Sequence, residues 1–291
     1  MITRQIKSER QVPLKTDPSR TKTVYTFKYL DESGKQVGKR LSEKCLHLKI
    51  PPVAWNVKIF PDAPKILATW QDEKGRDQKL YSNNHKETRK SKKFARCKNL
   101  AKNLKRIEQA ILYDIGSANV KDNEAASVLW IIKETGFRIG GMSDTKADVR
   151  AYGISTLLSR HVRLVGEDRV LFQFVGKKGV LNRKTVNNSV VRTIIESRKS
   201  PIRNRRLFDV SSGYCLQYLK KIAGDFQIKD LRTIKGTAAA IDLIARNGPP
   251  VRGGVVKYKK WQRGIAGKVA KLLGNSKSVA LSAYIDPTVW K

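Results

Sequence analysis

The feature that most constrains the fold is a change of residue pattern near position 85. Before it, β-branched and aromatic residues gather in short runs at 23–29, 57–60 and 66–70, separated by the turn-forming segments DESG and DEKG. Runs of this kind between polar turns are typical of β-strands. After it, apolar residues recur at the spacing of an amphipathic helix. We therefore expect an α+β protein with a small β-rich domain at 1–85 and a mostly helical domain at 86–291.

The second domain is expected to be helical apart from one β segment. Apolar spacing and end signals predict helices at 100–112, 124–136, 212–223, 230–246 and 261–273, and a last helix that carries Tyr284. We expect residues 122–124 to cap the second of these helices. Between 161 and 186, Val170, Phe172 and Phe174 alternate, and GKKG at 176–179 can close a hairpin. The prolines and glycines of 247–254 predict a mobile loop.

An excess of positive charge limits the function of the chain. Sixty Lys and Arg against 25 Asp and Glu give a net charge of +35, which opposes compaction unless a polyanion is near. Nucleic acid is the obvious polyanion. No apolar run approaches the roughly 18 residues of a membrane-spanning helix, and residues 1–10 have no apolar signal-peptide core. We therefore expect an intracellular, DNA-associated protein in a cell or virus, with no membrane contact.

The residues that usually bind metals are scattered. They are Cys45, Cys97, Cys215, His47, His85 and His161. Their spacing offers neither a disulfide framework nor a paired-cysteine zinc site, and we interpret His161 as a structural residue. We therefore expect no metal and no other cofactor.

Transfer of a phosphodiester needs a nucleophile, cations for the charge that builds on the phosphate oxygens, and an acid for the leaving oxygen. Arginines are the candidate cations, because a guanidinium offers a forked pair of donors. Arg138 lies between glycines in GFRIGG, where the backbone can approach a ligand closely. Arg232 lies in IKDLRT, which we expect in the first turn of a helix, where backbone N–H groups also favour anions. Each motif alone is a weak signal in a chain with 60 basic residues.

Several motifs stand in a distinctive order. They are KIPPVAW at 49–55, QDEKGRDQ at 71–78, Arg138, YGISTL at 152–157, RHV at 160–162, VGKKG at 175–179, KDLRT at 229–233, LGNS at 273–276 and Tyr284. This set resembles the type IB DNA topoisomerases, in particular the small forms of bacteria and large DNA viruses, over most of the chain. The resemblance implies a β-rich domain and a catalytic domain of the tyrosine recombinase/topoisomerase IB type that form a C-shaped clamp around duplex DNA.

The same resemblance implies a role for each catalytic residue. Tyr284 would attack the scissile phosphate and form a 3′-phosphotyrosyl intermediate with a free 5′-hydroxyl. Arg138 and Arg232 would bind the non-bridging oxygens, and Lys177 would protonate the leaving oxygen. Because the intermediate conserves the bond energy, religation needs no ATP, and rotation about the intact strand relaxes supercoils of either sign.

The chain departs from the family pattern at three places. Asn275 stands nine residues before Tyr284, where many members have a histidine; an amide donates a hydrogen bond there but cannot carry a proton. Lys178 beside Lys177 leaves the identity of the acid open by one position, although the family pattern favours Lys177. The GGMSD at 140–144 is not basic, unlike the corresponding run of the viral forms, so any sequence preference should differ.

Further residues are candidates for DNA contact. They are Arg76, Gln78, Lys79 and Tyr81 in the first domain, and Lys178 and Lys229 in the second. Lys79 replaces an aromatic residue of the viral forms, so base reading does not follow. The stretch 86–106 holds ten Lys or Arg against one Glu, which predicts a phosphate-tracking face where each single loss is mild.

Two other functions compete with this interpretation. A tyrosine recombinase or integrase uses the same chemistry, but its second arginine usually lies three residues after a histidine, and that position here is Lys229. A non-enzymatic basic DNA-binding protein would explain the charge but not the ordered motifs. We expect a monomer that acts on double-stranded DNA.

Overall fold

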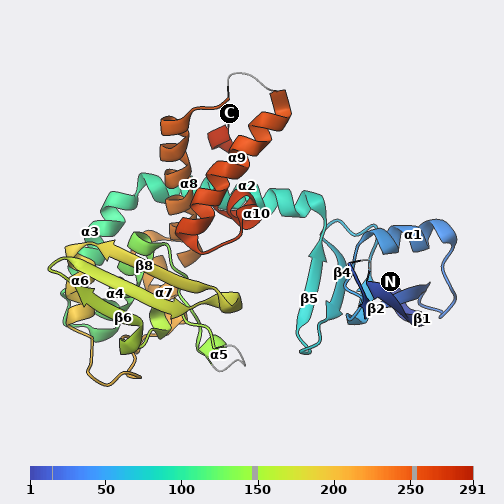
Figure 1. The fold of residues 1–291 in the computed structure, drawn as a ribbon, viewed down its shortest axis with the longest axis horizontal. Coiled ribbons are helices and arrows are strands. Elements are labelled where there is room, and N and C mark those ends of the chain that lie inside the picture. The colour runs from blue at the N-terminus through green and yellow to red at the C-terminus, as the bar shows by residue number, and fades with distance from the viewer. Residues whose placement is uncertain (15, 146–149, 251–253, 291) are drawn as a thin grey trace. The chain divides into compact units, whose positions relative to one another are not determined.

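The computed structural model describes residues 1–14, 16–145, 150–250 and 254–290. It divides into two compact units, Met1–Lys92 and Lys93–Lys291. Figure 1 shows a sheet with one short helix in the first unit, and helices with a smaller sheet in the second. The division falls within the helix α2 (Asn83–Lys102). The expected α+β class is confirmed.

Unit 1 is built on one five-stranded antiparallel sheet. Its strands, in the spatial order β2-β1-β3-β4-β5, are β1 (Ile2–Leu14), β2 (Asp17–Leu30), β3 (Trp55–Ile59), β4 (Ile66–Gln71) and β5 (Asp77–Tyr81). The helix α1 (Lys39–His47) follows β2. Apolar side chains from the sheet and from α1, among them Tyr29, Ile59 and Cys45, form the core of this unit.

The strands predicted at 23–29, 57–60 and 66–70 are confirmed as parts of β2, β3 and β4. The sequence did not indicate α1, β1 or β5. β1 is polar and mostly exposed, and it pairs with β2 as a long ribbon from Thr3↔Leu30 to Leu14↔Asp17. Its backbone hydrogen bonds rather than an apolar face hold it in place, so side-chain alternation carries no signal.

The helix predicted over 100–112 is interrupted. α2 ends and α3 (Leu104–Ile115) begins on either side of Asn103, whose φ of −96° and ψ of 5° are not helical. Leu100, Ile107 and Ile111 nevertheless enter the same hydrophobic core. The apolar spacing continues across the break, and therefore conceals it.

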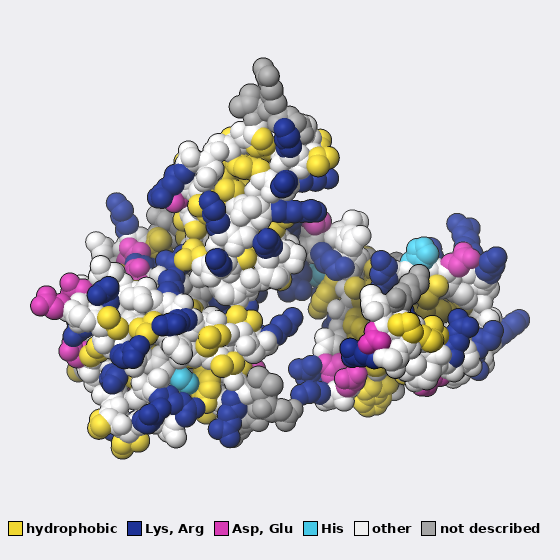
Figure 2. Space-filling model, viewed as in Figure 1, with side chains coloured by type: hydrophobic (Ala, Val, Ile, Leu, Met, Phe, Trp, Pro, Cys, Tyr) yellow, Lys and Arg dark blue, Asp and Glu magenta, His cyan; other side chains and the backbone are white. Residues whose placement is uncertain are grey.

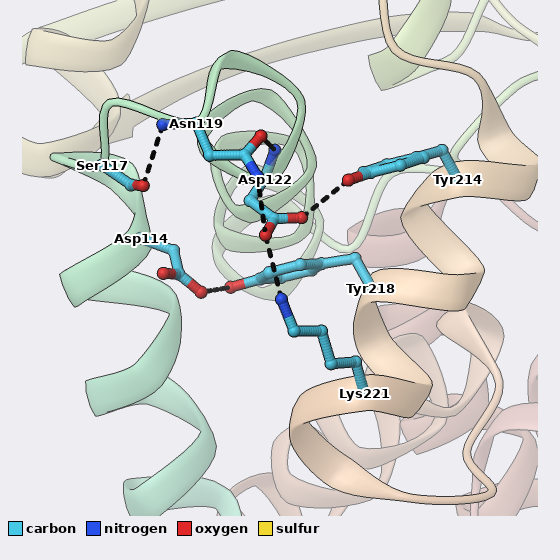
Figure 3. Close-up of polar contacts among 7 residues, drawn as sticks. All are labelled: Asp114, Ser117, Asn119, Asp122, Tyr214, Tyr218 and Lys221. Carbon is cyan, nitrogen blue, oxygen red and sulfur yellow. Dashed lines mark hydrogen bonds and ion pairs between the residues drawn. The ribbon is translucent and has the colours of Figure 1, made fainter.

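The helix α4 (Val120–Thr135) begins earlier than expected, and residues 122–124 do not cap it. The cap is Asn119, whose Oδ1 accepts a hydrogen bond from the backbone N–H of Asp122 (3.2 Å). The buried Asp122 instead accepts hydrogen bonds from the Tyr214 hydroxyl (2.8 Å) and from Lys221 Nζ (3.1 Å), both on α7 (Ser212–Ala223) (Figure 3). An acidic residue in the first turn of α4 thus ties two helices together.

A second contact between the helices lies beside this one. The Tyr218 hydroxyl of α7 donates to Asp114 Oδ2 of α3 at 2.7 Å (Figure 3). Tyr218 is 2% exposed, so water has little access to its hydroxyl, and Asp114 supplies the hydrogen-bond partner instead. Most residues of α4 are buried on every side, which makes it the central helix of unit 2.

A three-stranded antiparallel sheet interrupts the helices of unit 2, as predicted for 161–186. Its strands are β6 (Val162–Val165), β7 (Arg169–Val175) and β8 (Leu181–Asn187), in that order. A short 3-10 turn, η3 (Lys177–Gly179), joins β7 to β8. Val170, Phe172 and Phe174 are buried in the main core of the unit.

The remaining elements surround this core or form a second one. They are α5 (Met142–Thr145), η1 (Ile154–Thr156), η2 (Ser159–His161), α6 (Ser189–Glu196), α8 (Ile228–Asn247), α9 (Gly254–Leu273), α10 (Lys277–Val279), the π-helical turn η4 (Ala280–Tyr284) and η5 (Pro287–Trp290). The helices predicted at 212–223, 230–246 and 261–273 are confirmed, the last two within longer helices. Part of the predicted loop, 251–253, lies outside the described residues. Among the helices that the structure describes, none is long and apolar enough to cross a membrane.

Candidate active site

One pocket of unit 2 gathers four of the predicted catalytic residues. It has a volume of about 350 Å³, and Arg138, Lys177, Arg232 and Tyr284 line it together with Lys229. These residues come from the segment after α4, from η3, from α8 and from η4. The pocket therefore exists only in the folded chain, which brings together residues up to 146 positions apart, from Arg138 to Tyr284.

The end of α4 places Arg138. Gly136 terminates the helix with a φ of 72°, a left-handed conformation that favours glycine. The next residue, Phe137, is buried with its ring edge-on to Phe172 and Phe174, at centroid distances of 5.7 and 5.0 Å. Arg138 follows this anchored ring directly, and its carbonyl accepts a hydrogen bond from the Ile154 N–H (3.0 Å). The backbone of Arg138 is therefore held on both sides.

The side chain of Arg138 reaches the segment that joins α9 to α10. Its Nη2 donates to Asn275 Oδ1 at 2.5 Å, and its Nη1 donates to the Gly274 carbonyl at 3.5 Å. The Asn275 backbone N–H donates in turn to the Ala270 carbonyl (2.9 Å). Asn275 is thus brought to the site through Arg138, with its amide oxygen toward the guanidinium.

Arg232 is the buried cation of the site. It lies in the second turn of α8, one turn later than predicted, and is 3% exposed. Its Nη2 donates to the Leu273 carbonyl at 2.9 Å, and its Nε has no hydrogen-bond partner among the described residues. Burial lowers the pKa of the guanidinium to about 10, with Tyr284 opposing the shift and Arg138 adding to it. Arg232 therefore stays charged at neutral pH while one buried donor remains unused.

Tyr284 is the last residue of the π-helical turn η4 and lies against α8. The Arg232 guanidinium carbon is 5.1 Å from the centroid of its ring. The Thr237 hydroxyl donates to the Tyr284 carbonyl (3.2 Å). A Cβ on Gly236 would lie 2.8 Å from that carbonyl oxygen, so glycine is needed for the close approach of α8. The half-buried ring borders the pocket.

Lys177 and Lys178 occupy different positions in the turn η3. The turn closes through the Gly176 N–H, which donates to the Val180 carbonyl at 2.8 Å. Lys178 has a φ of 65°, and both lysines are exposed. Of the two, only Lys177 is among the described residues that line the pocket.

Lys93 is a neighbour of Tyr284 that sequence reasoning missed. Its ammonium nitrogen lies 5.6 Å from the Tyr284 ring centroid and donates to the Ala283 carbonyl. Burial lowers the pKa of this lysine. No local pattern distinguishes Lys93 from the other basic residues of 86–106. Its contacts with Ala283 and Tyr284, far away in the sequence, form only in the folded chain.

The residues predicted to contact DNA in unit 1 lie on or beside β5. Gln78 and Lys79 line a pocket of about 420 Å³ over β3 and β4. Arg76 forms an ion pair with Asp72, with Nη2 and Oδ2 2.7 Å apart. Hydrogen bonding from Arg76 lowers the pKa of Asp72 to about 2, so the pair stays ionised at neutral pH.

Tyr81 is covered by residues of α2. Its ring stacks on His85 at a centroid distance of 5.1 Å, and the Arg89 guanidinium lies 5.3 Å from the ring. Gln78 and Lys79 therefore border open space in unit 1, although Gln78 Nε2 also donates to Asp72 Oδ2 at 3.1 Å. Arg76 and Tyr81 have partners within the protein as well.

The cysteines take no part in the pocket. Cys45, Cys97 and Cys215 are free and buried, and burial raises the pKa of the last two thiols to about 12. Within the described ranges, no group of three or more His, Cys, Asp or Glu side chains could hold a metal ion. Figure 2 shows Lys and Arg spread over the visible face, with acidic side chains fewer.

Comparison with known proteins gives one consistent family. A profile of the family described as eukaryotic DNA topoisomerase I, catalytic core, matches residues 82–286, which is more than half of the chain. The DNA topoisomerase 1B of Acanthamoeba polyphaga mimivirus is 25% identical over 222 residues, which cover 70% of this chain and 65% of that protein. The chain thus spans somewhat less than two thirds of this relative.

Poxvirus proteins are similar at the same level. The DNA topoisomerase I of Monkeypox virus is 24% identical over 255 residues, covering 84% of this chain and 79% of that protein. The DNA topoisomerase 1B of Vaccinia virus (strain Copenhagen) is 26% identical over 199 residues, covering 64% and 61%. The matched family and these relatives agree with the resemblance drawn from the ordered motifs, and the chain belongs to the type IB DNA topoisomerase family.

Proposed function

We propose that this protein is a DNA topoisomerase that nicks one strand of duplex DNA, lets the duplex rotate to relax positive and negative supercoils, and reseals the strand. The observation that carries the proposal is the pocket in which Arg138, Lys177, Arg232 and Tyr284 meet. A tyrosine beside two guanidinium groups and a lysine supplies a nucleophile, charge neutralisation and a proton donor for phosphoryl transfer.

The chemistry proceeds in one balanced step. The Tyr284 hydroxyl oxygen attacks the scissile phosphorus and loses its proton to water. The bond to the 5′ oxygen breaks, and a proton from Lys177 Nζ converts that oxygen to a 5′-hydroxyl, leaving a 3′-phosphotyrosyl enzyme. Religation reverses the step, and consumes no ATP because the phosphotyrosine conserves the energy of the phosphodiester.

Arg138 and Arg232 stabilise the charge on the non-bridging oxygens in the transition state. Support comes from the buried Nε of Arg232, because a buried donor without a partner is costly unless a ligand completes its hydrogen bonds. A phosphate oxygen is such a ligand. Asn275 contributes hydrogen bonds alone, since an amide can donate a hydrogen bond but does not transfer its proton.

Double-stranded DNA is the proposed substrate, bound by a monomer whose two units clamp the duplex. The net charge of +35 favours a polyanion. Arg76, Gln78, Lys79 and Tyr81 of unit 1, and Lys178 and Lys229 of unit 2, are the proposed DNA contacts. The reaction uses no metal and no other cofactor in this scheme, because the arginines carry out the charge neutralisation.

The test is relaxation of supercoiled plasmid in EDTA without ATP. The parent protein should relax the plasmid, and Tyr284→Phe should not, because it lacks the attacking oxygen. Tyr113→Phe is the matched control, since Tyr113 is 83% exposed and lies outside the pocket; it should behave like the parent. No relaxation by folded parent protein across a range of salt would overturn the proposal.

The same assay separates the rival functions. A tyrosine recombinase would require paired sites and exchange strands between them. A non-enzymatic DNA-binding protein would shift the plasmid in a gel without changing its linking number, and Tyr284→Phe would have no effect.

A further inference from the structure

Asn182, in the strand β8, lies between the turn that carries the pocket residue Lys177 and the segment 273–275, which contacts the pocket residues Arg138 and Arg232. A Cβ on Gly176 would lie 2.4 Å from Asn182 Nδ2, and a Cβ on Gly274 would lie 2.8 Å from Asn182 Oδ1. Both distances are shorter than real Cβ contacts. The missing side chain of Gly176 therefore leaves room for the amide nitrogen of Asn182, and that of Gly274 leaves room for the amide oxygen. Gly176 precedes Lys177, and Gly274 precedes Asn275.

On one side, Asn182 helps to close the turn that carries Lys177. Its Nδ2 donates to the Val180 carbonyl at 3.1 Å. The same carbonyl accepts the Gly176 N–H at 2.8 Å, and the Gly179 N–H donates to the Gly176 carbonyl at 3.1 Å. Because φ at Gly176 is −101°, which any residue can adopt, backbone strain does not favour glycine there, and the close contact of an added Cβ would be with the amide of Asn182.

On the other side, Asn182 packs against the segment that receives the arginines. The Leu273 carbonyl accepts Arg232 Nη2 at 2.9 Å. The Gly274 carbonyl and the Asn275 amide oxygen accept Arg138 Nη1 and Nη2. Residues 273–275 therefore set the positions of both guanidinium groups, and Asn182 joins the lysine turn to this segment.

We propose that Asn182 is a positioning residue for proton transfer: it holds the Lys177 turn in register with residues 273–275, so that the lysine ammonium reaches the leaving 5′ oxygen while the arginines hold the phosphate. The proposal rests on the function proposed above. Asn182 itself is not among the described residues that line the pocket. A displacement of about 1 Å is enough to slow such a step by around a hundredfold.

The experiment compares two leaving groups in single-turnover cleavage. One duplex carries the normal 5′ bridging oxygen at a mapped cleavage site, and the other carries sulfur in its place. A thiol has a pKa of about 8.5, so a thiolate departs without a proton from the enzyme. The variants are Asn182→Ala, Asn182→Leu, which keeps a similar size without a polar group or a charge, and Lys177→Ala.

We expect Asn182→Ala and Asn182→Leu to cleave the oxygen duplex at least about tenfold more slowly than the parent, and the sulfur duplex within about twofold of it. Lys177→Ala should show the same contrast more strongly. The matched control is Asn187→Ala, an exposed asparagine at the end of the same strand, which should cleave both duplexes like the parent.

Three results would overturn the inference. The first is an equal loss of cleavage rate on both duplexes in the Asn182 variants, which would mean a general disturbance of the fold. The second is no loss on either duplex. The third is a loss in Asn187→Ala as large as that in the Asn182 variants. Failure of the proposed function looks different. In that case the parent itself would form no covalent adduct, or Lys177→Ala would be equally slow with oxygen and sulfur.

Discussion

The guanidinium carbon of Arg232 lies 5.1 Å from the centroid of the Tyr284 ring, in a part of the pocket where Arg232 is only 3% exposed. A cation at this position attracts the ring and will attract the phenolate oxygen once the proton has left. Low exposure strengthens both effects, because little water screens them. The proposed nucleophile and the cation that would stabilise its product are therefore positioned by the same contact between α8 and η4.

Replacement of Arg232 is expected to slow cleavage by on the order of a hundredfold or more, as for other lost transition-state donors. Arg232→Lys should recover little, since an ammonium cannot reproduce the forked donors. DNA affinity should change little, because one cation among 60 basic residues contributes a small share. The measurements are the single-turnover rate of covalent adduct formation and, separately, DNA binding.

Arg246→Ala is the control, because Arg246 is an exposed arginine at the end of the same helix, paired with Asp242. It should cleave at the parent rate. Near-normal cleavage by Arg232→Ala would remove this residue from the catalytic set.

Asn275 is expected to tolerate neutral replacements better than a charged one. Its Oδ1 accepts Arg138 Nη2 at 2.5 Å. In Asn275→Asp this contact becomes an ion pair that holds Arg138 and adds negative charge near the phosphate site. We expect Asn275→Asp to cleave about a hundredfold more slowly than the parent, Asn275→Ala about tenfold, and Asn275→His less than tenfold, because histidine keeps a donor.

The order of the three variants is the informative quantity in a single-turnover assay. Equal rates for Asn275→Asp and Asn275→Ala would mean that the contact between Arg138 and Asn275 does not persist when DNA is bound.

Local sequence signals predicted the elements with clear periodicity and failed where the contacts are long-range. The alternation at Val170, Phe172 and Phe174 is visible in the sequence because one face of β7 is buried. The polar strand β1 is held by its backbone partner β2, so its sequence has no such alternation. The cap of α4 was misplaced because Asp122 resembles a cap but bonds to α7 instead.

The residues in and around the pocket divide in the same way. Arg138, Lys177, Arg232 and Tyr284 were recognisable from ordered motifs, although no single motif was specific. Lys93 and Asn182 were not, because their positions depend on segments more than 90 residues away, at Ala283 and Gly274. Ordered motifs thus identified residues that the fold gathers in one pocket, whereas the residues that contact their neighbours became visible only in the fold.

Loss of Arg96 is expected to destabilise the protein. Asp230 is fully buried, and it accepts hydrogen bonds from Arg96 Nε at 2.7 Å and Nη2 at 3.1 Å. Arg96→Met would remove both of these hydrogen bonds and leave the carboxylate with the Gln227 N–H (2.9 Å) and the Cys97 thiol as neutral donors. We expect the free energy of unfolding to fall by about 3 kcal/mol, at the low end for a broken buried pair because Arg96 is partly exposed.

Urea unfolding followed by circular dichroism measures this loss. The double variant Arg96→Met, Asp230→Asn should recover part of it, because a neutral amide is less costly to bury than a charge. Lys92→Met, at an exposed position of the same helix, should unfold like the parent. If the single and double variants were equally unstable, the ion pair would not be the cause.

His161 is expected to make stability depend on pH below neutrality. It is 8% exposed, and its Nδ1 accepts the Leu158 N–H at 3.1 Å, which requires the neutral ring. Burial, assisted by Arg160, lowers the pKa of His161 to about 4 from its usual value of 6.5. Between these values the unfolded chain binds more protons at this residue than the folded chain does, so acidification lowers the free energy of unfolding.

The variant His161→Asn isolates this contribution, because the amide can still accept a hydrogen bond but does not titrate. The stability advantage of the parent over the variant should be largest at pH 7 and should shrink by on the order of 1–3 kcal/mol by pH 4.5. Urea unfolding of both proteins at a series of pH values gives the difference between their free energies of unfolding. The carboxylates titrate in both proteins, so their contribution cancels in this difference. A difference that stays constant from pH 7 to 4.5 would mean that His161 accepts its proton as readily in the folded protein as in the unfolded chain, and that its burial does not hold the ring neutral.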